Sequence, residues 1–372
     1  MVVVRVVKSF LVVLAASALL LFAVLAPASS GAGCAPLDCS TSQFAFAHGS
    51  LLGVRGNSRM PLRVIDLATG ATRWRLPAGM VGGHTLVHQD GRLLTWLDAA
   101  SGARVGDAVL QAHGTFVLAG VSQEGRQAVL ARTQHRSTTF AIVSRRVERV
   151  VRLGGNRWSF DALNGDNLFL VRTVRAGYQV RLLHLRSGVL ERAPLKDANE
   201  PATISGVPWS RVPSADGRYL FTLYVGPNGD SMVHVLDTRS GTARCVDLPG
   251  TGDFNAATSY ALVVDPDPRQ LWAVSPGYGR VARIDLPEHR VGDTYRFDAS
   301  SAWNTNVGIA TMSPDGERIA VTDAFHIWIV ELAQRKVIRA PSHVAIALAY
   351  SPDQKHLWVL GERSRVTALP VR

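Results

Sequence analysis

Residues 214–241 read SADGRYLFTLYVGPNGDSMVHVLDTRSG, and this stretch decides the fold. It opens with turn-forming residues at 214–217, continues through an apolar run at 218–225, and closes on LDTRSG at 236–241. Asp and Ser favour turns because their side chains bond to the nearby backbone, and Gly tolerates a positive φ. Turns of this kind around short apolar runs predict antiparallel β-hairpins.

The same two turn signals recur along the chain. Acidic or Gly/Pro turns between two apolar runs occur at 122–125, 163–166, 214–217, 265–268, 313–316 and 351–354. Apolar runs that close on a polar turn occur at 64–70, 97–102, 184–188, 236–241, 284–287 and 330–333. Two hairpins per unit make a four-stranded sheet, and large residues that alternate with Ala at 344–350 show the period of two typical of strands. No segment after the first 28 residues has helical periodicity over a useful length, so an all-β protein is predicted.

This pattern of turns and strands resembles the YVTN and WD40-like repeats of bacterial extracytoplasmic β-propellers. The resemblance covers nearly everything from about Phe44 to Arg372. It implies a closed β-propeller of four-stranded antiparallel blades over 44–372. It does not imply an activity, because propellers host binding, scaffolding and several hydrolytic chemistries.

The number of repeats predicts seven blades, with eight as the alternative. Six repeats run from Ser122 onward, and the stretch 44–112 supplies one or two more. The final unit, 344–371, has only three apparent strands. We therefore expect an N-terminal strand to complete this sheet and close the ring, since closure removes exposed strand edges.

The N-terminal segment has the three-part layout of a secretory signal. Arg5 and Lys8 precede an uncharged apolar run at 10–25, and small residues follow it. We predict a signal peptide or membrane anchor at 1–28, a short linker at 29–43, and an extracytoplasmic protein that is secreted or tethered to the outer face of the cytoplasmic membrane. Cleavage after 26–28, lipidation at Cys34 and an uncleaved anchor all stay open, because the apolar run is just short of a bilayer span.

The chain has three cysteines. They are too few for a disulfide scaffold but allow one bridge in an oxidising compartment. If Cys34 carries lipid, Cys39 and Cys245 remain as a pair that could tie the N-terminal segment to the propeller. If it does not, Cys34 with Cys39 is the more local bridge. The sequence leaves both pairings open.

Positive charge is concentrated in one part of the chain. The formal net charge of +11 falls to +9 without Arg5 and Lys8, and the stretch from Arg126 to Arg192 alone holds 13 arginines against four acids. The rest of the chain after residue 28 is therefore neutral on balance. An excess over two consecutive blades predicts a positive sector that attracts an anionic partner in a salt-sensitive way. The arginines assigned to it are Arg126, Arg132, Arg136, Arg145, Arg146, Arg149, Arg152 and Arg157.

In the predicted extracytoplasmic compartment, the candidate partners are an anionic lipid headgroup, a cell-wall polymer or an acidic protein. No nucleic acid is expected there, and the membrane enters through the N-terminal segment if that segment is retained or lipidated. An equal possibility is a solvated arginine-rich surface with no partner.

No catalytic, metal-binding or cofactor-binding set stands out in the sequence. The Gly120–Gly125 stretch is one residue too long for a nucleophile elbow, and Asp265 with Asp267 lacks the further oxygen ligands of a calcium loop. The leading hypothesis is a non-enzymatic binding module. The alternative is a lactonase-like or lyase-like propeller enzyme with its site at the central opening, which would require carboxylates and imidazoles to converge on the axis.

Overall fold

The structure is a computed structural model that describes residues 43–48, 51–55, 61–155, 157–196, 201–297, 309–322, 326–340, 345, 347–361 and 366–371. These residues lie in the compact unit Cys34–Arg372. The predicted signal or anchor at 1–28 lies outside them, as does the predicted linker except for Gln43. Eight sheets follow one another along the chain, and in each sheet the strands pair in sequence order. We number these sheets as blades 1 to 8.

Blades 1 to 4 are four-stranded antiparallel meanders. Their strands are β1 Gln43–His48, β2 Leu51–Arg55, β3 Leu62–Asp66 and β4 Thr72–Leu76 in blade 1; β5 Met80–Gly82, β6 Thr85–Asp90, β7 Leu93–Asp98 and β8 Arg104–Val109 in blade 2; β9 Val117–Val121, β10 Ala128–Gln134, β11 Ser137–Val143 and β12 Glu148–Gly154 in blade 3; and β13 Trp158–Asn164, β14 Asn167–Val174, β15 Gly177–His184 and β16 Val189–Leu190 in blade 4.

Blades 5 to 7 repeat this arrangement, and blade 8 has three described strands. A single short helix, α3 Phe254–Thr258, lies between blades 5 and 6 in an otherwise all-β set of described elements. The strands are β17 Val207–Pro213, β18 Tyr219–Val225, β19 Ser231–Asp237 and β20 Thr242–Leu248 in blade 5; β21 Ala261–Val264, β22 Gln270–Ser275, β23 Arg280–Asp285 and β24 Arg290–Arg296 in blade 6; β25 Ile309–Met312, β26 Arg318–Thr322, β27 Ile327–Glu331 and β28 Lys336–Ala340 in blade 7; and β29 Ala347–Tyr350, β30 His356–Leu360 and β31 Val366–Pro370 in blade 8.

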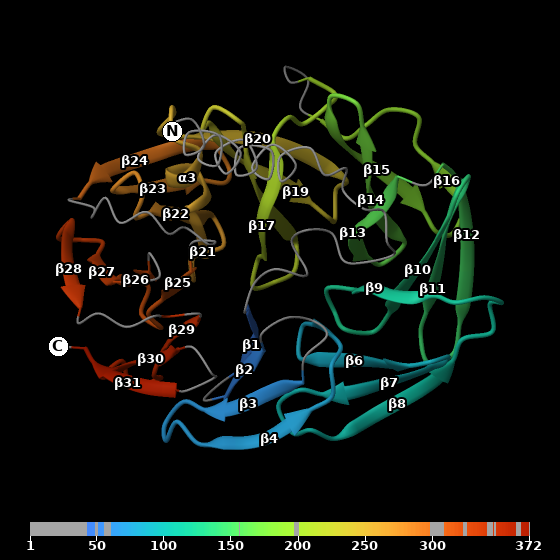
Figure 1. The fold of residues 1–372 in the computed structure, drawn as a ribbon, viewed down its shortest axis with the longest axis horizontal. Coiled ribbons are helices and arrows are strands. Elements are labelled where there is room, and N and C mark those ends of the chain that lie inside the picture. The colour runs from blue at the N-terminus through green and yellow to red at the C-terminus, as the bar shows by residue number, and fades with distance from the viewer. Residues whose placement is uncertain are drawn as a thin grey trace, which may run out of the picture. The chain divides into compact units, whose positions relative to one another are not determined.

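The sheets stand in a ring, with the first strand of each blade nearest the centre and the last strand at the rim (Figure 1). The first strands of successive blades contact one another, as β5 does with β9 and β21 with β25. The fold is therefore a β-propeller, as predicted, and it has the alternative number of eight blades. The prediction of seven was wrong because 44–112 forms two complete blades, although neither has the Ser-x-Asp-Gly signature after its first strand.

The ring closes through side-chain packing. Among the described strands, β1 pairs with β2 inside blade 1 and not with blade 8. The expected strand that completes the last sheet is therefore not among them, and for the residues before Gln43, which lie outside the described residues, it stays a prediction. Blade 8 instead packs on blade 1 through a cluster that joins Ile65 and Leu67 to residues of β29 and β30. The Trp358 indole donates a hydrogen bond to the Leu67 carbonyl, and its ring lies so close to Gly70 that a Cβ there would meet it at 2.6 Å.

Every neighbouring pair of blades shares a buried apolar cluster. A buried Leu or Val contributes roughly 1.5–3 kcal/mol, so these clusters hold the ring together. Small residues on the inner strands permit close packing between blades. At Gly120 on β9, a Cβ would lie 2.0 Å from the Phe160 ring of blade 4, so only Gly fits there.

The recurrent turn residues form the predicted networks. In blade 5, the Ser214 hydroxyl donates to Asp216 at 2.7 Å and accepts from the Tyr219 amide at 2.9 Å. The second type of turn uses Asp237, whose carboxylate accepts from the amides of Arg239 and Ser240. Both networks satisfy backbone groups that would otherwise be left open where a strand reverses.

Candidate functional site

The arginine-rich stretch 126–192, which we call the basic sector, forms blades 3 and 4 from the β9–β10 turn to just after β16. Its predicted binding residues divide between the two ends of blade 3 because antiparallel strands place alternate turns at opposite ends. One end, with the β9–β10 and β11–β12 turns, carries Arg126, Arg145 and Arg146. The other end, with the β10–β11 turn and the link to blade 4, carries Arg136 and Arg157. The strands between the two ends carry Arg132, Arg149 and Arg152.

Seven of these eight arginines are exposed, and Arg132 is the exception. Arg132 is partly buried on β10, where its Nη1 donates to the His113 carbonyl at 2.6 Å. Its guanidinium also lies over the Phe116 ring, 5.1 Å from the centroid. Arg132 therefore packs the link between blades 2 and 3 more than it faces solvent.

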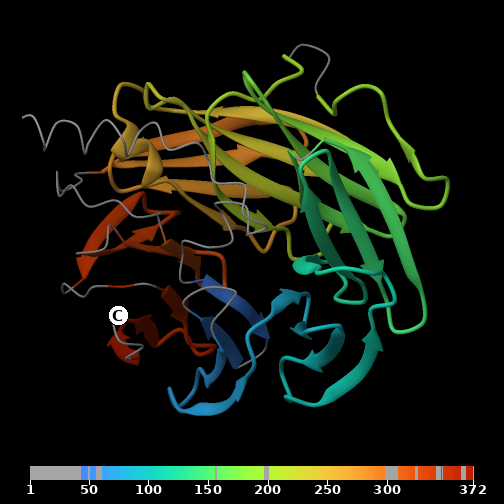
Figure 2. The same cartoon turned by 45° about the vertical axis from the view of Figure 1, so that its right-hand side comes forward.

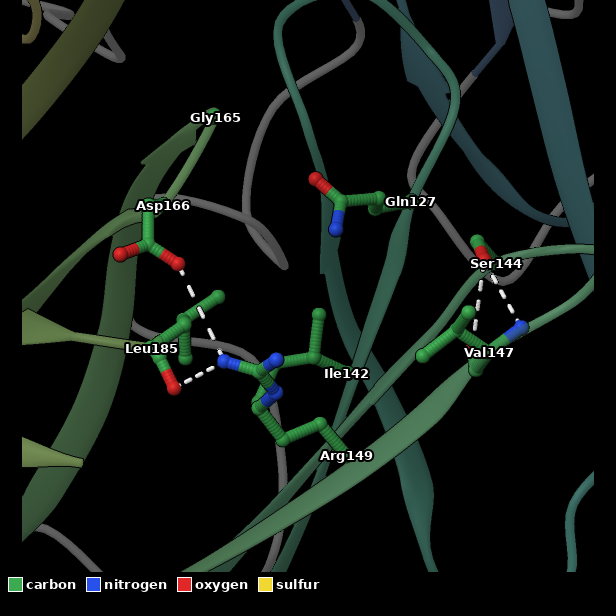
Figure 3. Close-up of a pocket in the computed structure, with 8 residues that line it drawn as sticks. All are labelled: Gln127, Ile142, Ser144, Val147, Arg149, Gly165, Asp166 and Leu185. Atoms are coloured by element: carbon green, nitrogen blue, oxygen red, sulfur yellow. Dashed lines mark hydrogen bonds and ion pairs between the residues drawn. The ribbon is translucent and has the colours of Figure 1, made fainter. Parts of the chain in front are cut away.

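Arg149 and Arg145 are held in place by neighbouring blades. Arg149 reaches from β12 to blade 4, where it donates to the Leu185 carbonyl and lies 3.9 Å from the Asp166 carboxylate (Figure 3). Arg145 reaches the other way and donates to the Val105 carbonyl of β8 at 3.2 Å. A Cβ at Gly106 would touch its side chain at 2.4 Å, so the glycine makes room for it.

A small hollow lies between blades 3 and 4 beside Arg149 (Figure 3). Its empty volume is about 360 Å³, and both apolar and polar side chains line it. Gln127 and Ser144 add polar groups on the blade 3 side, while Asp166 adds a negative charge on the blade 4 side. Sequence reasoning missed Gln127 and Ser144, because a lone Gln or Ser in a turn gives no signal of a site.

The acids of the basic sector leave most of its arginines without a carboxylate partner. The Glu148 carboxylate accepts from the amides of Gln111 and Ala112 at 2.6 and 2.7 Å, which fixes the link between blades 2 and 3. Glu191 pairs with His184 at 3.0 Å.

The third acid, Asp161, pairs with Arg211 of blade 5 at 2.8 Å, outside the sector. Only Asp166 approaches a sector arginine within 4 Å in the described part of the chain. The charge excess seen in the sequence is therefore not neutralised locally.

Asp161 and Arg211 face each other across the inner strands β13 and β17. Their side chains are 4% and 17% exposed. Burial raises the pKa of Asp161, and the charge of Arg211 opposes this increase. Burial also raises the pKa of nearby Tyr224. Sequence reasoning missed this pair, whose sequence signal is the single charged residue in the mostly apolar stretch 158–163.

In the part of the chain that the structure describes, the inner strands carry one carboxylate and one guanidinium. Among the described inner strands, Asp161 and Arg211 are the only Asp, Glu, Lys or Arg residues, and they pair with each other. Within the described residues, no three His, Cys, Asp or Glu side chains gather as a metal site. Trp209 lies two residues before Arg211 on β17, partly buried and edge-on to Phe254.

The predictions for the N-terminal region remain predictions. Cys34 and Cys39 lie outside the described residues, whereas Cys245 lies partly buried on β20, opposite His234 in register. Neither disulfide pairing is therefore tested. No described helix is long and apolar enough to span a bilayer.

Comparisons with known proteins agree with the fold. No family model and no curated protein matches this chain. The chain is similar to the β-propeller domain of Cps50 (Swd1) from Myceliophteria thermophila, with a TM-score of 0.50 and 14% identity over 90% of this chain and 97% of that one. It is also similar to the Dos1 propeller, with a TM-score of 0.51 and 9% identity over 90% and 93% of the two chains.

Hydrazine synthase from Kuenenia stuttgartiensis is a third similar structure, with a TM-score of 0.43 and 15% identity over 78% of this chain and 93% of that one. The likeness to the two propeller domains, at identities this low, shows a shared fold and nothing about activity.

Proposed function

We propose that this chain is an exported β-propeller that acts as a non-enzymatic binding module at the cell envelope, and that its basic sector holds an anionic partner. One observation carries the proposal: the sector has 13 arginines, and in the described structure only Arg149 has a carboxylate within 4 Å. A guanidinium presents its donors in a planar fork that matches phosphate and carboxylate groups. Exposed guanidinium groups without a carboxylate partner, concentrated on two adjacent blades, therefore provide donors for an anionic surface or chain.

The compartment is part of the same proposal. The layout of the N-terminal segment and the resemblance to YVTN repeats support export, with the membrane as an attachment point if that segment is kept or lipidated. The anionic groups available there belong to lipid headgroups, cell-wall polymers and acidic proteins. We do not expect nucleic acid as the partner.

The inner strands favour binding over the lactonase-like or lyase-like alternative. Such an enzyme needs an acid, a base or metal ligands that converge on bound substrate. The carboxylate of Asp161 on the described inner strands is instead buried and paired with Arg211. The propeller thus offers its outer surface more readily than its axis.

A charge-reversal experiment tests the sector. The full chain and a variant with Arg145, Arg146, Arg149 and Arg152 all changed to Glu are compared for binding to phosphocellulose and to phosphatidylglycerol vesicles over a range of salt. We expect the wild type to bind and the variant to lose binding at every salt concentration. The matched control reverses four exposed cations of blades 6 and 7 with the same change in net charge: Arg269, Arg290, Arg296 and Lys336.

Two results would contradict the proposal. Equal losses in the sector variant and the control would show that net charge alone drives retention. Unchanged binding in the sector variant would show that these arginines have no partner role. Export is checked separately by fractionating cells and measuring the intact mass of the protein, since a full-length protein in the cytoplasmic fraction contradicts it.

A further inference from the structure

The positive charge of blade 3 extends from one end of the sheet to the other. Arg145 and Arg146 lie in the β11–β12 turn, and Arg136 lies in the β10–β11 turn at the opposite end. Arg157 shares that second end, because the preceding Gly155 donates its amide to the Arg136 carbonyl at 2.9 Å. Strand β12 between these ends spans roughly 20 Å at strand rise.

The outer strand connects the two charged ends. β12 is the last strand of its sheet and lies at the rim, where Figure 1 labels it on the right; Figure 2 turns this side toward the viewer. It carries Arg149 and Arg152, and both are exposed. Their positions along the strand differ by roughly 10 Å at strand rise. Val150 between them is 49% exposed, and Val147 in the preceding turn is 59% exposed.

This placement discriminates between a flat and a linear partner. When a bilayer surface meets one end of the sheet, arginines roughly 20 Å away lie beyond two Debye lengths of about 8 Å at physiological salt. A linear chain that follows the rim can reach the arginines at both ends and those between them. The exposed valines suit the uncharged backbone of such a chain, since apolar surface between the charges can also be covered.

We infer that the partner of the basic sector is a linear polymer with repeated phosphate or carboxylate groups. It lies along β12 from the Arg145–Arg146 turn to Arg136 and Arg157, and one of its anionic groups sits at the hollow beside Arg149. This inference rests on the proposed function, because it names the partner of the same surface. Asp166 borders the hollow and repels that group, so the site is not optimised for the tightest binding.

Inorganic phosphate chains of two lengths serve as probes, with the full chain immobilised. Tripolyphosphate is too short to cover β12, whereas long-chain polyphosphate is several times longer than the strand. Because the long chain joins separate contacts into one binding event, we expect it to bind about a hundredfold more tightly than tripolyphosphate. Phosphatidylglycerol vesicles are measured in parallel.

Paired variants test whether both ends take part. Arg145→Gln with Arg146→Gln removes one end, and Arg136→Gln with Arg157→Gln removes the other. Each pair should weaken long-chain binding and reduce the slope of log K against log salt by about 1.4, as for two lost phosphate contacts. Arg290→Gln with Arg296→Gln changes the outer strand of blade 6 in the same way and should alter neither quantity.

Asp166→Asn should change the binding affinity in the opposite direction. Removal of the negative charge beside Arg149 should strengthen binding of both phosphate probes about threefold to tenfold, as expected for one nearby charge at a partly exposed site. Because this variant gains binding, misfolding cannot mimic the result.

The outcomes separate the inference from the proposal it rests on. If polyphosphate binds but chain length has no effect, or if only one end contributes, the linear partner is wrong while the anion-binding sector stands. Tighter binding to vesicles than to long polyphosphate would instead favour a membrane surface. If neither polyphosphate nor vesicles bind in a sector-dependent way, the proposed function itself fails.

Discussion

The paired charges of Asp161 and Arg211 allow a quantitative test of the packing between blades 4 and 5. Arg211→Met removes the positive partner and leaves a carboxylate that is 4% exposed. Breaking a buried ion pair from one side typically costs about 3–5 kcal/mol. Protonation of Asp161 limits this loss, because the neutral acid needs no partner.

The limit depends on pH in a calculable way. Protonating a carboxyl with an unfolded pKa of about 3.9 costs about 1.36 kcal/mol for each pH unit above that value. The loss of stability in Arg211→Met is therefore limited to about 4 kcal/mol at pH 7 and about 1.5 kcal/mol at pH 5. The direction of this pH dependence follows from burial, which raises the pKa of Asp161 in the folded state. The stabilising effect of a raised pKa is complete below the unfolded pKa and is lost as pH rises through the folded one.

Urea unfolding followed by tryptophan fluorescence at pH 7 and pH 5 measures both values. Asp161→Asn should destabilise without this pH dependence, and the double variant should return to within about 1 kcal/mol of the wild type. Arg218→Met is the control, because its pair with Asp237 is 44% exposed on the arginine side. Such an exposed pair should contribute at most about 1 kcal/mol. A loss below about 1 kcal/mol for Arg211→Met at pH 7, or equal losses at both pH values, would refute the reasoning.

Three further substitutions test other parts of the ring. Gly120→Ala should destabilise by about 1–3 kcal/mol because the new methyl group overlaps the Phe160 ring, and Phe160→Leu in the same chain should restore part of the loss in a urea titration. Trp358→Phe removes the hydrogen bond to Leu67, so amide exchange should rise in blades 8 and 1 before it rises elsewhere; uniform exchange would contradict a seam at this position. Tyr278→Phe removes a hydroxyl that donates to either of two backbone carbonyls, those of Gly229 and Asp253, at 2.8 Å. It should lower the unfolding midpoint by an amount equivalent to about 1 kcal/mol, which thermal melting can measure.

The sequence was sufficient for the fold class because its turn signals are local. Ser214 and Asp237 bond to the backbone within a few residues, so their chemistry is visible in a short window. The number of blades was harder to predict because blades 1 and 2 lack the first of these signals. β5 is only three residues long, and such a strand leaves little pattern in the sequence.

Closure and the inner ion pair depend on contacts between distant residues. Trp358 and Leu67 are separated by almost the whole propeller in the sequence, and no local pattern near either residue predicts their contact. Asp161 could be noticed as a charge in an apolar strand, but its partner Arg211 could not be identified without the neighbouring blade.

The basic sector is an intermediate case. Counting charges located it on two consecutive blades, and the antiparallel order of the strands then placed its arginines at both ends of one sheet. The count could not show that Arg132 is packed against Phe116 or that Glu148 is engaged with backbone amides. Those assignments depend on the link between blades 2 and 3, which is not visible in a count of charges.

The side-chain seam between blades 8 and 1 has a consequence for how the chain folds. Every ladder between described strands joins sequence neighbours, so each sheet can form from its own segment without waiting for a distant strand. Pairing of distant strands is slow because loop-closure entropy must be overcome before contacts reward it. Here the late, long-range step is the docking of two finished sheets through apolar surfaces. We therefore expect this propeller to be assembled blade by blade from its N-terminal side, with the joining of its first and last blades as the final event.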